Sequence, residues 1–131
     1  MKNSLKLEEL AQFCLIAFML YAAHMPWWVF LLLALGPDIG MLGYLVNTRV
    51  GAVCYNLLHH KGIAIVLVFI GQAARYSTAY DSSLGDLDEV FFITGVILYG
   101  HASMDRIFGF GLKYSNSFKR THLGWMGGRS M

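Results

Sequence analysis

Charged side chains are scarce in this sequence of 131 residues. Lysine, arginine, aspartate and glutamate make up 14% of the chain, whereas hydrophobic residues make up 56% and aromatic residues 15%. A soluble domain typically has about 25% charged residues, and one of this size could not bury so much apolar surface. We therefore expect the lipid bilayer to surround the protein. The net charge of +2 argues against a nucleic-acid partner.

Cysteine and the common catalytic motifs are also scarce. The two cysteines, Cys14 and Cys54, form no CxxC pair, so we expect two buried small hydrophobes rather than a disulfide or a zinc site. The chain has no phosphate-binding glycine loop, nucleophile elbow or HExxH motif. Glu8 and Glu9 interrupt the N-terminal region and no cleavage motif follows, so the first apolar run is expected to remain as a membrane helix.

The long apolar runs predict an all-α membrane bundle with four transmembrane spans in a single domain, residues 1–131. About 20 apolar helical residues are needed to cross a bilayer. Pro37 interrupts the second run and predicts a kink there, and a short extra helix over residues 50–60 is expected before the third span. The spans are predicted at about residues 10–24, 27–46, 63–80 and 90–110.

The distribution of lysine and arginine predicts the orientation of these spans. Most of these residues fall in segments 1–9, 47–61 and 111–131, whereas the opposite side receives only Arg75. Loops rich in positive charge stay in the cytoplasm. Both termini, including the basic tail 111–131, are therefore predicted to be cytoplasmic.

The last predicted span contains two ionisable residues, which are energetically unfavourable inside a membrane. His101 and Asp105 are four residues apart, so they lie on one face of a helix. Ionisable groups inside a membrane usually mark a functional site. Asp38 lies at a similar depth beside the proline break, and His59 and His60 lie at the cytoplasmic mouth of the third span. We expect these side chains to meet in the cytoplasmic half of the bundle, where sites on facing helices are built.

Two functional interpretations of this group are open. In the first, Asp38, His101 and Asp105 bind a metal ion together with His59 or His60, and such imidazole and carboxylate donors suit zinc, manganese or iron. In the second, Asp38 and His101 form a metal-free acid/base pair or proton relay.

A third interpretation is purely structural. Asp105 pairs with Arg106 or Arg49, and the other polar groups satisfy one another within the bundle. Tyr55 and Asn56, one turn before the paired histidines, are expected either to hydrogen-bond to them or to link helices.

Five short motifs are distributed along the chain: GPDIGMLGY at 36–44, YNLLHH at 55–60, GHASMDR at 100–106, GLKY at 111–114 and THLGW at 121–125. Together they resemble a family of small bacterial integral membrane proteins known only as a domain of unknown function. The resemblance extends from about residue 10 to 125. It implies a compact helical domain in the bacterial cytoplasmic membrane, and it brings no activity, substrate or cofactor.

These observations favour a membrane enzyme that acts on a lipid-like substrate. Asp38, His101 and Asp105 are its candidate catalytic residues, and a divalent metal is its candidate cofactor. The alternatives are a binder of a hydrophobic ligand, a proton-coupled carrier, or an interaction subunit whose polar residues only fix helix packing. A carrier made of four short spans would need to form a homo-oligomer, because a monomer leaves little room for a pathway.

Overall fold

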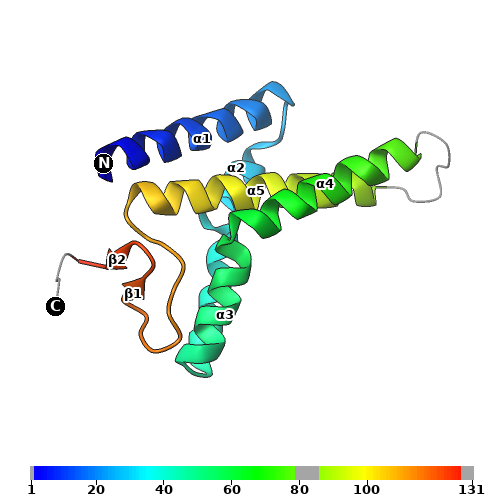
Figure 1. Cartoon of the computed structure of the whole chain (residues 1–131). Coiled ribbons are helices and arrows are strands. Elements are labelled where there is room, and N and C mark those ends of the chain that lie inside the picture. Colours follow the sequence, from blue (N-terminus) through cyan, green and yellow to red (C-terminus); the bar gives the residue numbers. More distant parts are fainter. Residues whose placement is uncertain (1, 79–85, 128–131) are drawn as a thin grey trace.

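The computed structural model describes residues 2–78 and 86–127 and has the predicted all-α fold (Figure 1). Its helices are α1 (Lys2–Ala22), α2 (Trp27–Leu35), the 3₁₀ helix η1 (Gly36–Leu45), α3 (Thr48–His59), α4 (Lys61–Thr78) and α5 (Leu87–Ile107). The tail also forms a short antiparallel hairpin, β1 (Arg120–Thr121) with β2 (Gly124–Trp125), which the sequence did not predict. The end of the predicted third span, residues 79–80, and the last four residues of the tail lie outside the described part.

Proline sets the two breaks in the N-terminal half. Pro26 has an extended backbone and immediately precedes the first residue of α2. Pro37 lies at the start of η1. Because proline has no N–H to donate to the preceding turn, it interrupts the α-helical bonding pattern, and the chain continues as the tighter 3₁₀ helix. The interruption predicted at Pro37 therefore takes the form of a change of helix type.

The short helix predicted over residues 50–60 is a separate element, α3. The side chain of Asn47 caps its start, as asparagine does at many helix N-termini. His60 ends it in an extended conformation, and α4 then continues at an angle of 48°. η1 runs beside α3 (Figure 1) so closely that a Cβ on Gly40 would lie 2.8 Å from the carbonyl oxygen of Cys54. This close packing holds the middle of η1 against α3.

α5 is the central helix of the fold (Figure 1). It packs against α1, α2 and α4, and α1 runs antiparallel to it. At Gly95 the backbones of α4 and α5 come close together, since an added Cβ would lie 2.6 Å from the carbonyl oxygen of Ala64. The core between α1, α2 and α5 is built from Ile16, Leu20, Val29, Leu33, Val96 and Ile97.

Large apolar side chains cover much of the outer surface. Phe18 on α1, Leu31 on α2 and Phe69 on α4 are 65%, 51% and 70% exposed. Within the described residues, one helical segment, Trp27–Leu45, is long and apolar enough to cross a membrane, and the bent pair α3–α4 is a second if it counts as one span. The four predicted spans are thus not confirmed, because charged residues near the start of α1 and at both ends of α5 make these helices less apolar.

One burial prediction is wrong. Cys14 is exposed on α1, and Cys54 is only partly buried. The reason is that α1 buries the face that carries Ile16 and Leu20, and Cys14 lies on a different face.

The close contact at Gly95 predicts a large cost for a small substitution. Gly95→Ala places a methyl group against the backbone of α4, where nothing can move aside cheaply, so we expect a loss of about 1–3 kcal/mol of stability. Gly36→Ala is the matched control, because its Cβ would meet only Leu32 at an ordinary 3.4 Å. Thermal unfolding of the purified protein checks both variants. A melting temperature for Gly95→Ala equal to that of Gly36→Ala would contradict this packing.

Candidate metal centre

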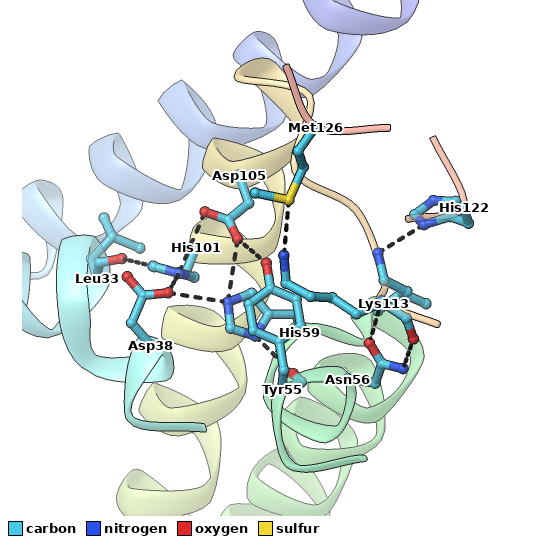
Figure 2. A network of polar contacts seen from close by, with 11 residues as sticks. Leu33, Asp38, Tyr55, Asn56, His59, His101, Asp105, Lys113, His122 and Met126 are labelled. Carbon is cyan, nitrogen blue, oxygen red and sulfur yellow. Dashed lines mark hydrogen bonds and ion pairs between the residues drawn. The ribbon is translucent and has the colours of Figure 1, made fainter. Parts of the chain in front are cut away.

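Four side chains from three helices converge beside the C-terminal half of α5 (Figure 2). They are Asp38 from η1, His59 from the last turn of α3, and His101 with Asp105 from α5. One donor atom from each lies within 4.8 Å of the donor atoms of the other three. The structure therefore brings together four of the five residues that the sequence singled out. Figure 2 shows their polar atoms pointing toward a common centre.

Both imidazole rings are anchored through Nδ1. The Nδ1 atom of His101 lies 2.9 Å from the carbonyl oxygen of Leu33, and that of His59 lies 2.8 Å from the carbonyl oxygen of Tyr55. A carbonyl oxygen can only accept a hydrogen bond, so each Nδ1 must carry the proton. In a neutral ring this leaves the other nitrogen, Nε2, with a free lone pair.

Pro37 explains why the carbonyl group that binds His101 is free. In an α-helix the carbonyl oxygen of Leu33 would accept from the N–H of the residue four positions later. That residue is Pro37, which has no N–H. The carbonyl is thus left without its helical partner and is available to the imidazole of His101. The break at Pro37 therefore supplies one of the two carbonyl groups that orient the imidazole rings.

The two Nε2 atoms face the carboxylates without hydrogen-bonding to them. Both nitrogens are buried and have no hydrogen-bond partner among the described residues. The Nε2 atom of His59 lies 3.6 Å from an oxygen of Asp38 and 3.3 Å from one of Asp105. For His101 the corresponding distances are 3.3 Å and 3.6 Å. With neutral rings, two lone pairs point at two acceptor-only groups, and positive charge between them, either as a cation or as protons on the imidazoles, would relieve this arrangement.

The surrounding side chains hold this geometry in place. The hydroxyl of Tyr55 donates to Asp105 Oδ2 at 2.5 Å, and the Tyr55 ring stacks on His59 with centroids 3.7 Å apart. His59, His101 and Asp105 are 3%, 0% and 8% exposed. The side chain of Asp38 is 39% exposed and forms the open side of the site.

Two expectations from the sequence are not met. His60, the alternative to His59 as a ligand, is exposed outside the cluster, and its Nδ1 accepts from the N–H of Gly62 at 3.1 Å. His60 ends α3 in an extended conformation, which turns it away from the face that carries His59. Asp105 is not paired with Arg106, whose guanidinium instead lies 3.6 Å from Glu9.

Lys113 is a neighbour of the site that sequence reasoning missed. It is 5% exposed, and its Nζ lies 4.6 Å from the ring centroid of Tyr55 and 4.2 Å from that of Phe118. Burial lowers the pKa of the Lys113 ammonium, while the carboxylates of Asp105 and Asp38 act in the opposite direction. Only its place within the GLKY motif could have drawn attention to it.

Asn56 holds Lys113 at this position. Its side-chain oxygen accepts from the N–H of Lys113 at 2.7 Å, and its amide donates to the carbonyl oxygen of Lys113 at 2.8 Å. Asn56 was expected to bond to the histidines or to link helices. It instead fastens the segment after α5 onto α3, and so closes one side of the site.

The chain belongs to the family described as a domain of unknown function, DUF4260, whose model matches residues 2–126. This match includes all four converging residues and the tail up to Met126. No curated protein and no solved structure matches the chain. The membership agrees with the resemblance drawn from the sequence motifs, and it assigns no chemistry to the site.

Proposed function

We propose that this protein is a membrane metalloenzyme whose centre is a single divalent ion held by Asp38, His59, His101 and Asp105. The observation that carries the proposal is the pair of buried, unpartnered Nε2 atoms that face two carboxylates. A divalent cation between them would neutralise both carboxylates and accept both lone pairs. Neutral imidazoles anchored through their other nitrogen are the usual form of metal-binding histidines.

The contacts between imidazoles and carboxylates have the spacing expected of ligands around one ion. Ligands about 2.0–2.2 Å from a tetrahedral metal stand about 3.3–3.6 Å from one another. The four distances between imidazole nitrogens and carboxylate oxygens, 3.3 to 3.6 Å, fall in this range, although they involve both oxygens of Asp105. Because donor atoms in the group are separated by up to 4.8 Å, a bound ion would draw the side chains closer together. Two nitrogen and two oxygen donors suit zinc, manganese or iron better than a metal that prefers thiolates.

The partly exposed side of Asp38 suggests how a substrate would reach the ion. An ion held by His59, His101 and Asp105, with the partly exposed Asp38 giving up its position to substrate or water, would act as a Lewis acid on a carbonyl or phosphoryl oxygen or would lower the pKa of a bound water. The exposed apolar surface of the helices favours a lipid-like substrate. Without a metal, the same contacts would require protonated imidazoles, which is the acid/base or proton-relay alternative carried by Asp38 and His101.

We also propose that the protein lies in the bacterial cytoplasmic membrane as four spans, formed by α1, α2–η1, α4 and α5, with α3 as the short helix before the third span and both termini in the cytoplasm. The ion pairs that Glu9 makes with Lys61 and Arg106 support this, because they bring the start of α1, the start of α4 and the end of α5 to one end. Arg75 pairs with Asp88 at the α4–α5 connection. A homo-oligomer is compatible with the exposed apolar faces, and no nucleic-acid partner is proposed.

The metal proposal is tested by elemental analysis of the purified chain. We expect about one equivalent of a transition metal in the wild type and none in His101→Ala or Asp105→Asn, because each variant removes a ligand. His60→Ala is the matched control, since this neighbouring histidine lies outside the cluster, and it should keep the metal.

A more conservative substitution distinguishes the loss of metal binding from the loss of the folded structure. Tyr55→Phe keeps the stacked ring and removes only the hydrogen bond to Asp105, so metal affinity should fall by about 10–100-fold in a folded protein. A wild type without metal after growth and dialysis with zinc, manganese or iron would contradict the proposal. Metal content equal in wild type and His101→Ala would contradict it as well.

The orientation is tested by cysteine labelling in a Cys14→Ser, Cys54→Ser background. Ser115→Cys in the exposed part of the tail should react with a membrane-impermeant maleimide only after cells are permeabilised. Asp86→Cys, exposed at the start of α5, should react in intact cells and serves as the control. The reverse pattern would show that the termini face outward.

A further inference from the structure

A cavity of about 450 Å³ lies between the first turns of α1 and the segment that follows α5. Its volume falls within the range of small-molecule sites, about 300–1,000 Å³. None of the four candidate metal ligands lines it, so it is a separate site. Its lining combines basic and large apolar side chains, among them Lys2, Lys6, Arg106, Phe108, Phe110 and Trp125.

The basic side chains give this cavity a net positive lining. Lys2 and Lys6 are four residues apart on α1, so they project from one face of the helix, and within the described part of the chain neither has an ion-pair partner. Glu9 also lines the cavity. It is already compensated by Lys61, which lies outside the lining, and by Arg106. An anionic group would therefore meet uncompensated positive charge here.

His122 adds an uncharged donor to the lining. Burial and the nearby charge of Arg106 lower the pKa of its imidazole, so the ring is neutral at physiological pH. Its Nδ1 accepts from the N–H of Leu112 at 2.8 Å, which places the proton on Nε2. An N–H donor beside ammonium and guanidinium groups suits the oxygens of a phosphate.

The apolar part of the lining is largely unburied. Phe108 and Trp125 are 67% and 45% exposed, and Leu5 from α1 lines the same cavity and is 51% exposed. Aromatic rings beside lysine and arginine are typical of the membrane–water interface. In the proposed orientation the cavity lies at the cytoplasmic interface, within reach of lipid.

We propose that this cavity binds an anionic amphiphile with a phosphate head and an acyl chain. Lys2, Lys6 and Arg106 hold the phosphate, and the acyl chain packs along Phe108 and Trp125. Neither the positive charge nor the apolar surface alone would select such a ligand, and both line the same cavity.

Two side chains, Lys113 and Tyr55, lie between the cavity and the ligands of the candidate metal centre. Met126 lines the cavity, and its sulfur lies 3.1 Å from Nζ of Lys113, which covers the ring of Tyr55. Tyr55 in turn donates to Asp105 (Figure 2). Because Lys113 and Tyr55 lie between the cavity and the metal ligands, the cavity is a binding site beside the centre and not its substrate pocket. Binding in the cavity therefore does not rest on the proposed function.

Native mass spectrometry of the full chain in nonionic detergent tests the binding. Short-chain phosphatidic acid should bind at least about tenfold more tightly than phosphatidylcholine of the same chain length. Lys2→Gln with Lys6→Gln should reduce phosphatidic acid binding by about tenfold, as expected for the loss of charge-assisted contacts. Lys119→Gln, an exposed lysine of the tail outside the cavity, is the matched control and should bind as the wild type does.

Three results would overturn the inference. They are equal binding of the two lipids, unchanged binding in the Lys2/Lys6 variant, and displacement of phosphatidic acid by an equal concentration of inorganic phosphate, which would identify free phosphate as the ligand. The same preparations are analysed for metal. Lipid binding in a preparation without metal would keep this inference and remove the proposed function, and metal without lipid binding would do the reverse.

Discussion

The hydrogen bond between His101 and the carbonyl oxygen of Leu33 is the contact on which the site depends. It exists because Pro37 cannot supply the helical N–H that this carbonyl would otherwise bind. The bond fixes the proton on Nδ1 of a fully buried ring and turns the Nε2 lone pair toward Asp38 and Asp105. A backbone irregularity on one helix thus determines which ring nitrogen of a side chain on another helix carries the proton.

The other elements hold the remaining donors against this ring. α5 supplies Asp105 one turn after His101, and Tyr55 fixes its carboxylate while stacking on His59. The break between α3 and α4 places His59 at the end of a helix whose partner, η1, carries Asp38. The site therefore needs both irregular points of the chain, the proline break and the α3–α4 bend.

Much of this arrangement could be predicted from the sequence, and the failures have physical causes. The spacing of His101 and Asp105 indicated the shared helix face, and Pro37 indicated the helix break from which the free carbonyl of Leu33 follows. The choice between His59 and His60 depends on the backbone conformation in which α3 ends, which no spacing encodes. Lys113 was missed because its burial comes from long-range packing of the tail. Of the four predicted spans, the described residues contain one or two helices that are long and apolar enough to cross a membrane, because charged residues in α1 and α5 make those helices less apolar.

The most direct test of the central claim is X-ray absorption spectroscopy of the metal-loaded protein. We predict a first shell of nitrogen and oxygen donors at about 2.0–2.2 Å, with the scattering pattern of two imidazole rings. The pattern of one ring should disappear in His59→Ala and remain in His60→Ala. A shell that contains sulfur, or oxygen donors without any imidazole, would contradict the account.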